Sequence, residues 1–341
     1  MAILNGGLLT LAGLGLVCAW LSYAFNGKLM PLYRRYALAR PNARSSHTTP
    51  TPQGGGLGML GALAVGLAAC VLLVPNSGLA GWPYGALATG AVLLATTGWL
   101  DDIFELPVIP RLAAQFAAAG LGVYAALAMA GVSPVSVLAA LAIPVLLVGL
   151  VWMINLTNFM DGIDGITVAE FVPIASVLAM FSVAGAAPFA NGLIGAAVLG
   201  ALAGFAPYNR HVAKLFLGDV GSLPLGLLAG VLLLALALTG HVTAALILPL
   251  YYLADATLTL LRRLANGENV TMAHRSHFYQ RATKLGWSVP MVTRRIWLTN
   301  GGLGVLALMS AAWPNWVAQA ACLAAAFWLT ARTLRAFSQS Q

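Results

Sequence analysis

The chain has 341 residues; 60% of them are hydrophobic, only 8% are charged, and the formal net charge is +8. Soluble globular proteins carry about 25% charged residues, and a water-soluble fold cannot cover this much apolar surface. The composition therefore excludes an ordinary soluble enzyme and predicts an integral membrane protein. The 3 cysteines all lie inside apolar runs, so they predict neither a disulfide framework nor a metal site.

Apolar runs long enough to cross a bilayer as helices, which takes about 20 residues, recur along the whole chain. The runs are apolar on all sides, whereas the strands of a membrane barrel would alternate. We therefore expect an all-α polytopic bundle of about 11 spans, formed by one membrane domain over residues 1–341. No Lys or Arg precedes the first run, so a retained helix is favoured over a cleaved signal peptide. The expected spans are 3–25, 57–75, 84–100, 112–131, 134–152, 166–184, 189–207, 222–240, 242–262, 297–313 and 315–333.

The segments between these runs fall into two classes that alternate along the chain, one short and uncharged and the other charged. Alternation puts all 17 Lys and Arg residues on one side, which the positive-inside rule makes cytoplasmic, with the N-terminus outside and the C-terminus inside. The 9 Asp and Glu residues gather on or just beneath the same face. Because acids contribute little to topology, we expect a functional surface there. The charged segments are 26–56, 101–111, 153–165, 208–221, 263–296 and the C-terminal tail.

Two adjacent carboxylates, Asp101 and Asp102, end the third expected span. At the C-terminus of a helix they meet the negative end of the helix dipole, and they also repel each other. A single acid there would be a solvated helix end. A pair is better explained by a divalent cation, because Mg²⁺ typically takes one or two carboxylates together with phosphate oxygens.

Asn155, Asn158, Asp161 and Asp164 follow one another at three-residue steps after the fifth expected span. This step places polar side chains on one helical face, and the interleaved glycines allow tight turns. A calcium loop is one alternative, but its pattern with a terminal Glu is absent. An ordinary connecting loop is the other, and it would rarely keep its polar groups in one register, so a binding segment is favoured.

Two further acids have both a structural and a functional interpretation. Asp219 stands just before the eighth expected span, where a carboxylate can cap the helix and complement its dipole. That role does not account for the exposed Phe216 and the glycines around it. Asp255 lies inside the ninth expected span, so it is a functional candidate, with pairing to a nearby Arg or helix end as the equal alternative.

The first and last charged segments are rich in basic residues. The last contains His274, Arg275 and His277, and the first contains His47. Such segments usually set the topology and bind anionic lipid, and they also suit phosphate binding. A zinc pair formed by His274 and His277 lacks a third ligand.

Carboxylates for a metal and basic groups for phosphate, together on one membrane face, are what phosphoryl transfer between anions requires. One substrate at a lipid boundary would be a lipid phosphate, and the net positive charge would attract a nucleotide-activated partner. A transporter or lipid flippase is the main alternative. Transporters place ionisable groups near the bilayer midplane, often in inverted repeats, and the sequence has neither feature. A binding scaffold without chemistry would not need so many carboxylates.

The order of these motifs resembles that of the polyprenyl-phosphate N-acetylhexosamine-1-phosphate transferases. This polytopic family includes the peptidoglycan phospho-N-acetylmuramoyl-pentapeptide transferase and the enterobacterial N-acetylglucosamine enzyme. Each piece is modest alone, but the ordered set, from about residue 47 to 281, is highly specific. The matching pieces are Pro52-Gln-Gly-Gly-Gly56, Asp101-Asp102 with Arg111 and Gln115, Asn155 to Gly165, Phe216 to Ser222, Asp255 with Arg262-Arg263, and His274 to His277.

The resemblance implies an enzyme of the bacterial inner membrane that transfers sugar 1-phosphate from a UDP-N-acetyl sugar to undecaprenyl phosphate and releases UMP. It implies Mg²⁺, or Mn²⁺ in its place, and direct attack by the lipid phosphate is favoured over a two-step route through an aspartate nucleophile. We expect no nucleic-acid partner, and a homodimer is compatible with the sequence. The implied catalytic residues are Asp101, Asp102, Asp161, Asp164, His274 and His277; the implied substrate-binding residues are Asn155, Asn158, Phe216, Arg275, His47 and Arg111; the implied metal ligands are Asp219 and Asp102.

The basic loop departs from the two best-known branches of the family. It reads His274-Arg-Ser-His277, whereas the peptidoglycan enzyme resembles a loop with three successive histidines and the N-acetylglucosamine enzyme a His-x-His-His form. The loop is similar to that of the O-antigen branch, so UDP-N-acetylfucosamine or UDP-N-acetylquinovosamine is expected as donor, in the initiating step of O-antigen or lipopolysaccharide glycan synthesis. UDP-N-acetylglucosamine is the alternative. His47 stands near a position where the family often has Lys.

Overall fold

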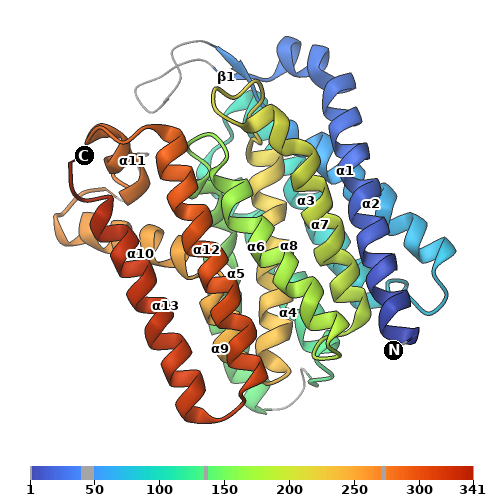
Figure 1. Cartoon of the computed structure of the whole chain (residues 1–341). Helices are drawn as coiled ribbons and strands as arrows, with labels where there is room; N and C mark the ends of the chain where they lie inside the picture. Colours follow the sequence, from blue (N-terminus) through green and yellow to red (C-terminus); the bar gives the residue numbers. More distant parts are fainter. Residues whose placement is uncertain (1, 40–49, 134–136, 270–273, 341) are drawn as a thin grey trace.

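The computed structural model describes residues 2–39, 50–133, 137–269 and 274–340. These residues form thirteen α-helices and one two-stranded antiparallel sheet (Figure 1). The elements are α1 (Ala2–Tyr36), β1 (Leu38–Ala39), β2 (Thr51–Pro52), α2 (Gly55–Leu73), α3 (Trp82–Phe104), α4 (Val108–Met129), α5 (Val137–Met160), α6 (Ile166–Val183), α7 (Phe189–Asn209), α8 (Asp219–Leu238), α9 (Val242–Ile247), α10 (Leu250–Ala265), α11 (Phe278–Lys284), α12 (Val289–Ala312) and α13 (Trp316–Ala336).

The expected all-α polytopic membrane fold is confirmed. Eight helices of the described residues are long and apolar enough to cross a membrane, namely α1, α2, α4, α5, α6, α7, α8 and α13. Two further expected spans correspond to α3 and α12, which have 23 and 24 residues and so are also long enough at about 1.5 Å per residue.

The expected single span at 242–262 is wrong, because the chain forms two separate helices there, α9 and α10. Pro249 stands at the break, where its missing N–H cannot continue the hydrogen-bond ladder of α9. In α10 the usual distribution is reversed: the buried face carries Asp255 and Arg263, and the exposed face carries leucines. Such a helix keeps its polar side chains inside the protein and presents hydrocarbon to lipid. The exposed leucines are Leu258, Leu261 and Leu264.

Several helices extend into segments that were expected to be loops. The expected loop 153–165 is wrong in its first half, because α5 continues to Met160 and carries Asn155 and Asn158. Asn155 stays in the helix with its side-chain amide donating to the carbonyl of Val151, one turn earlier (2.9 Å). Most of the expected loop 101–111 is also helical, so Arg111 lies on α4.

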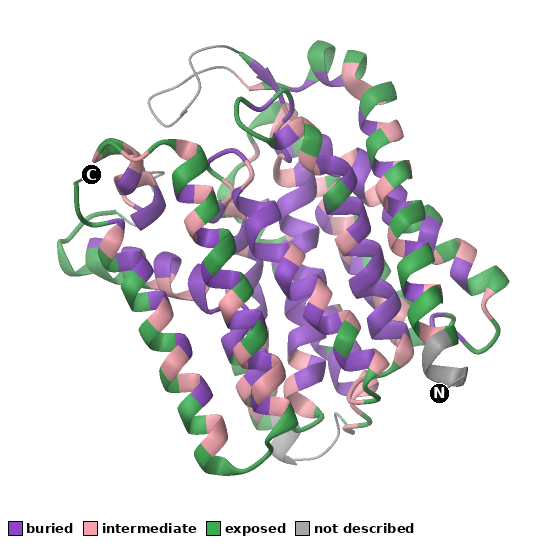
Figure 2. Ribbon diagram, in the orientation of Figure 1, coloured by how far each residue is buried: buried purple, intermediate pink, exposed green. Residues whose placement is uncertain are grey.

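The centre of the bundle is α8, which is buried along nearly all of its length (Figure 2). It packs against α3, α4 and α5, and α7 packs between α1 and α6. Glycines allow the closest approaches: a Cβ added at Gly98 of α3 would clash with the backbone of Asp219, and one at Gly56 of α2 with that of Gly221. Small residues at crossings are the usual means of helix packing in a membrane.

The charged segments meet at one end of the bundle, called here the charged end. It is the end at which α1, α3, α5, α7 and α13 finish and α2, α4, α6, α8 and α12 begin (Figure 1). The turns that the structure describes at the opposite end, 74–81, 184–188, 239–241 and 313–315, contain no Lys, Arg, Asp or Glu. At the charged end β1 pairs with β2, and Gln53, which follows β2, makes a parallel bridge to Phe216.

Candidate functional site

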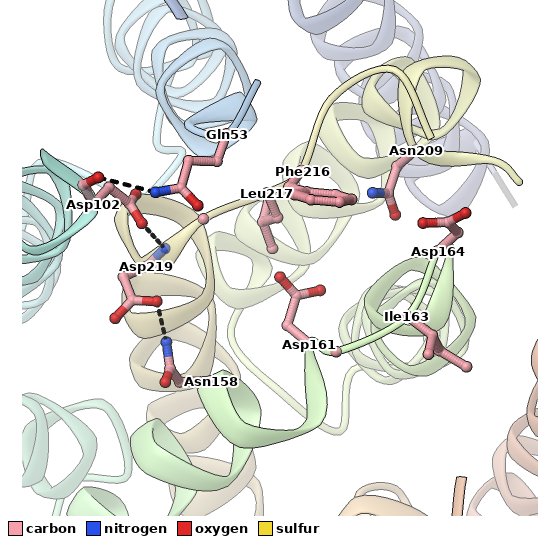
Figure 3. Close-up of a pocket in the computed structure, with 12 residues that line it drawn as sticks. Gln53, Asp102, Asn158, Asp161, Ile163, Asp164, Asn209, Phe216, Leu217 and Asp219 are labelled. Carbon is pink, nitrogen blue, oxygen red and sulfur yellow. Dashed lines mark hydrogen bonds between the residues drawn. The ribbon is translucent and has the colours of Figure 1, made fainter. Parts of the chain in front are cut away.

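A pocket of about 180 Å³ opens at the charged end, where β2, α3, α5, α7 and the start of α8 meet (Figure 3). Four of the nine acids of the chain contribute to it, and they come from three separate charged segments. Its lining comprises Gln53, Asp102, Asn158, Asp161, Gly162, Ile163, Asp164, Asn209, Phe216, Leu217, Gly218 and Asp219.

Asp102, at the end of α3, holds the first turn of α8. Its Oδ1 accepts the backbone N–H of Asp219 (3.0 Å) and its Oδ2 accepts that of Val220 (3.2 Å). The first N–H groups of a helix lack partners inside the helix, so a carboxylate from a neighbouring helix satisfies them and complements the dipole. Gln53 donates from Nε2 to the carbonyl oxygen of Asp102 (2.9 Å) and fixes the end of α3.

The Asp219 carboxylate lies on the pocket side of this turn, beside Asn158. The Asn158 amide donates to Oδ1 of Asp219 (2.7 Å) and to Oγ of Ser222 (3.0 Å), so α5 and α8 share one polar contact. The carboxylates of Asp101 and Asp102 are near enough to interact electrostatically with that of Asp219.

Converging carboxylates of this kind need a proton or a cation to offset their repulsion. Asp102 and Asp219 provide the hard oxygen ligands that Mg²⁺ prefers, so the donor set fits the expected ion. Within the described residues, no three His, Cys, Asp or Glu side chains come together as a closed metal site. A pair of carboxylates fits an ion that takes its remaining ligands from water and substrate phosphate.

Asp161 and Asp164 belong to the turn between α5 and α6 and point to different sides of it. Asp161 faces the ring of Phe216 across the pocket (Figure 3), and its Oδ1 accepts the hydroxyl of Thr167. Burial raises the pKa of Asp161 to about 6. Asp164 turns away from Asp219 and is bonded through Oδ2 to Nδ1 of His211 (2.8 Å).

Phe216 is fixed by backbone hydrogen bonds to the last residue of β2 and the first residue of α2. Its N–H donates to the carbonyl of Pro52 and its carbonyl accepts the N–H of Gly55, each at 2.9 Å. The ring thereby lies flat over the pocket (Figure 3), where it can stack on a planar base. Asn209 lies beside it and donates to the carbonyl of Leu215 (3.1 Å). Sequence reasoning missed Asn209, although an amide at the end of an apolar helix is a signal that could have found it.

Asp101 and Arg111 form a pair outside the pocket lining. Arg111 Nη1 lies 2.7 Å from Oδ2 of Asp101, whose Oδ1 accepts the N–H of Leu106 (2.7 Å). Asn155 is also outside the lining, one turn below Asn158, and donates to Oε1 of Gln115 (2.6 Å). These three expected site residues therefore surround the pocket from α3, α4 and α5.

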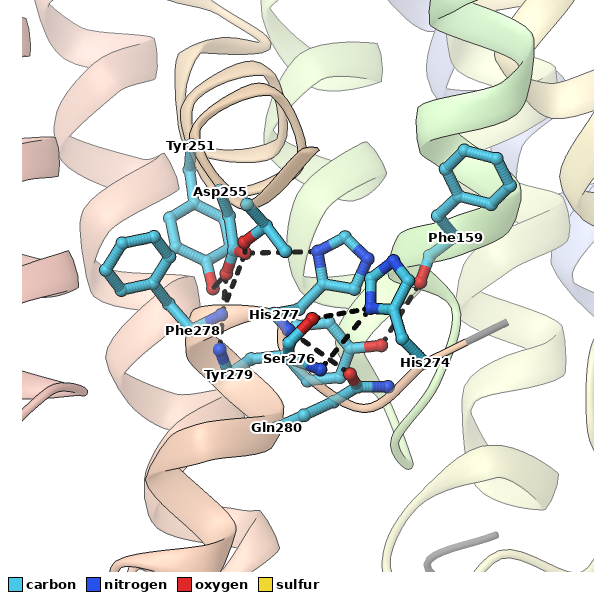
Figure 4. Close-up of polar contacts among 10 residues, drawn as sticks. Phe159, Tyr251, Asp255, His274, Ser276, His277, Phe278, Tyr279 and Gln280 are labelled. Atoms are coloured by element: carbon cyan, nitrogen blue, oxygen red, sulfur yellow. Dashed lines mark hydrogen bonds and ion pairs between the residues drawn. The ribbon is translucent and has the colours of Figure 1, made fainter. Parts of the chain in front are cut away.

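The basic loop is organised by Asp255, which lies on α10 and caps α11 (Figure 4). Its Oδ1 accepts the N–H of Phe278 (2.9 Å) and its Oδ2 accepts that of Tyr279 (3.2 Å) and the hydroxyl of Tyr251 (3.2 Å). His277 Nδ1 lies 3.3 Å from the same carboxylate. Of the two interpretations of Asp255, the structure supports the pairing with a helix end.

The loop histidines lie next to each other beside this cap, with their rings tilted by 32°, and they do not line the pocket. The rings of His274 and His277 are 4.9 Å apart, and His277 is only 4% exposed. Tyr279 donates its hydroxyl to the carbonyl of Phe159 (3.2 Å), which connects α11 to the end of α5. Arg275, between the histidines, is half-buried. His47 lies outside the described residues.

Comparison with known proteins gives the family. Residues 84–237 match the family described as Glycosyl transferase family 4. The chain is 30% identical over 332 residues to the decaprenyl-phosphate N-acetylglucosaminephosphotransferase of Mycobacterium tuberculosis (strain CDC 1551 / Oshkosh), covering 85% of this chain and 80% of that protein. It is therefore a multi-pass membrane protein that belongs to Glycosyl transferase family 4.

Shorter similarities point to two further relatives. The chain is 35% identical over 106 residues to the probable undecaprenyl-phosphate N-acetylglucosaminyl 1-phosphate transferase of Bacillus subtilis (strain 168), covering 30% of this chain and 29% of that protein. It is 34% identical over 118 residues to the phospho-N-acetylmuramoyl-pentapeptide-transferase of Symbiobacterium thermophilum, covering 33% and 32%. These names confirm the expected family, but they do not include the fucosamine or quinovosamine branch.

Proposed function

We propose that the protein transfers an N-acetylhexosamine 1-phosphate from a UDP-sugar to a polyprenyl phosphate, undecaprenyl phosphate in the first instance, on the cytoplasmic face of a bacterial inner membrane. The observation that carries the proposal is the convergence of Asp102 and Asp219 with the Phe216 ring in one pocket. Carboxylates suit a metal-bound diphosphate and the flat ring suits a base, so the pocket combines the two halves of a nucleotide. The names of the relatives supply the acceptor lipid.

In the proposed reaction, an oxygen of the lipid phosphate forms a bond to the phosphorus that carries the sugar. The bond from that phosphorus to the bridging oxygen breaks, so UMP leaves and the sugar remains on a lipid diphosphate. Direct attack is favoured because a phosphate is already a competent nucleophile. Mg²⁺ bound by Asp102 and Asp219 would supply charge neutralisation for the diphosphate.

The other pocket residues hold the reactants in this scheme. Phe216 stacks on uracil, and Asn158 keeps the Asp219 carboxylate oriented through its 2.7 Å bond. Asp161 faces the ring and is available as a proton acceptor. His274 and Arg275 are half-buried in the basic loop, which Tyr279 connects to the end of α5, and would bind a phosphate or sugar there. The buried His277 contacts Asp255 in the same loop and would position it.

The proposal is tested with purified protein, a UDP-N-acetyl sugar and undecaprenyl phosphate, by following UMP. Release should require both the lipid and Mg²⁺, with Mn²⁺ as a substitute, and should cease on chelation. Asp219→Ala should lose about 100-fold or more in rate, because a ligand of the metal is removed. Glu268→Gln, an exposed acid paired with Arg263, is the matched control and should retain full rate. Normal release from Asp219→Ala would reject the metal site.

The donor sugar has two candidates, each with its own support. The names of the relatives favour UDP-N-acetylglucosamine. The His274-Arg-Ser-His277 pattern favours UDP-N-acetylfucosamine or UDP-N-acetylquinovosamine, and with them O-antigen or lipopolysaccharide synthesis. A panel of UDP-N-acetyl sugars, read by the mass of the lipid product, decides between them.

A further inference from the structure

A second pocket, of about 500 Å³, opens at the charged end between α6, α7 and α12. It adjoins the first pocket through Asp164, which contributes to both linings. Its walls combine basic and apolar side chains, which is unlike the acidic first pocket. Its basic side chains are Arg210, His211 and Arg294, and its apolar ones include Val168, Ala206 and Trp297.

The second pocket is positively charged. Within the described residues neither Arg210 nor Arg294 forms an ion pair, and both are exposed. The one acid of the lining, Asp164, is engaged by His211 at 2.8 Å and by the N–H of Ala213 at 3.2 Å. Two arginines without acidic partners suit a phosphate, which guanidinium groups bind through paired, charge-assisted hydrogen bonds.

The position of the pocket relative to the bilayer surface indicates which kind of molecule carries that phosphate. Trp297 is 38% exposed, and tryptophan gathers at the boundary between bilayer and water. The next residue of α12, Leu298, is 66% exposed, as expected for a helix side that contacts hydrocarbon. Val168 and Ala206 continue the apolar wall. A ligand with a phosphate near the arginines and hydrocarbon near Trp297 and the apolar wall matches this arrangement.

A hydrogen-bonded wall separates the second pocket from the carboxylate pair of the first. The N–H of Gly165 donates to Oδ1 of Asn209 (2.8 Å), and Thr293 donates to the carbonyl of Asp164 (2.9 Å). A phosphate between Arg210 and Arg294 would lie on the other side of these bonds from Asp219, which lines only the first pocket. A lipid other than the acceptor therefore suits the second pocket.

We propose that the pocket between α6, α7 and α12 binds the phosphate head group of an anionic bilayer phospholipid, with Arg210 and Arg294 on the phosphate and Trp297 beside the first carbons of its chains. This site adjoins the one proposed for transfer but has its own arginines for the phosphate, and its binding can be measured without turnover.

The test uses the full-length protein in nanodiscs of phosphatidylcholine with a rising share of phosphatidylglycerol. In one series the phosphatidylglycerol has brominated chains and in a second series the phosphatidylcholine does. Brominated chains quench tryptophan fluorescence on contact. Subtracting the signal of Trp297→Phe isolates Trp297 from the other tryptophans. Brominated phosphatidylglycerol should quench Trp297 at a lower share than brominated phosphatidylcholine does. Arg210→Gln and Arg294→Gln should each reduce this preference about five-fold.

Arg332→Gln is the matched control, because Arg332 is also an exposed arginine beside a tryptophan, Trp328, but outside the pocket. It should keep the full preference. Added inorganic phosphate and undecaprenyl phosphate should leave the quenching unchanged. Equal quenching by the two lipids in the unmodified protein would overturn the proposal whether or not the variants fold. Displacement by undecaprenyl phosphate would overturn it too, by making the pocket part of the acceptor site.

Discussion

At the scale of residues, the acids of this protein fall into two working groups. Asp102 and Asp255 each accept two backbone N–H groups at the start of a helix that is not their own, α8 and α11. Asp161 and Asp219 line the pocket without capping another helix in this way, and Asp102 lines the pocket as well as capping α8. The sequence singles out all four acids, but not this division, because Asp102 and Asp219 are 117 positions apart and their bond depends on the packing of α3 on α8.

The raised pKa of Asp161 predicts a pH-dependent gain of stability in Asp161→Asn. The native pKa is about 6 and the ordinary value is 3.8, so between these values the folded protein binds more protons than the unfolded chain. Stability therefore falls as the pH rises through this window. At neutral pH and without metal, Asp161→Asn should be more stable by at most about 3 kcal/mol, less where water reaches the pocket.

Thermal unfolding in a buffer that contains a chelator measures this gain at neutral pH and at about pH 4. The two proteins should differ most at neutral pH and should converge in acid. A difference that grows in acid would reverse the sign and contradict the buried position of the carboxylate.

At the scale of elements, apolar runs fix most of the helices, and polar details decide the remainder. The runs at 166–184, 189–207 and 315–333 match α6, α7 and α13 closely, because each run has about the length of one span. The break between α9 and α10 was missed, since the run 242–262 is apolar enough to hide the effect of Pro249. The helix α11 was missed as well, because its start depends on Asp255, from a different helix.

Asp255→Ala tests this dependence of α11. The variant leaves the N–H groups of Phe278 and Tyr279 without their buried acceptor, at a cost of about 1–3 kcal/mol for each. The melting temperature should fall and transfer activity should fall further, because His277 loses its contact. Thr259→Val is the control, since the bond from Thr259 to Asp255 is long (3.4 Å) and its loss should cost little. Equal losses of stability and activity in the two variants would contradict the role of Asp255 as the cap of α11.

The approach of α3 to α8 predicts opposite effects of alanine at two helical glycines. In Gly98→Ala the new methyl group would meet the backbone of Asp219, so the helices must separate and the turn held by Asp102 is disturbed. We expect a loss of about 1–3 kcal/mol and of transfer activity. Gly120→Ala, on α4 with nothing within 4 Å, should gain up to about 1 kcal/mol through helix propensity. The unfolding temperatures of both variants measure these effects. An unchanged unfolding temperature for Gly98→Ala would contradict the close packing of α3 on α8.

At the scale of the whole molecule, the sequence predicts best that the charged segments gather at one end of the bundle. Alternation of charged and uncharged segments requires only chain order, and the structure brings the charged segments to one end. The division of that end into two pockets was not predicted. It depends on the turn at 161–165 and the bond between Gly165 and Asn209, which no local pattern reveals. Sequence patterns indicate topology or substrate binding for the basic residues as a group, whereas only the fold brings Arg210 and Arg294 into the lining of one pocket.

The side of the membrane that the charged end faces can be tested by labelling cysteines. If the charged end is cytoplasmic, a cysteine at exposed Asn266, just after α10, should react with a membrane-impermeant thiol reagent only when the cytoplasmic side is open. A cysteine at exposed Ala80, in the turn before α3, should react from outside. Cys18, Cys70 and Cys322 are buried and should stay silent in both cases. Labelling of Asn266→Cys from outside would invert the molecule and separate the pocket from any cytoplasmic nucleotide-sugar.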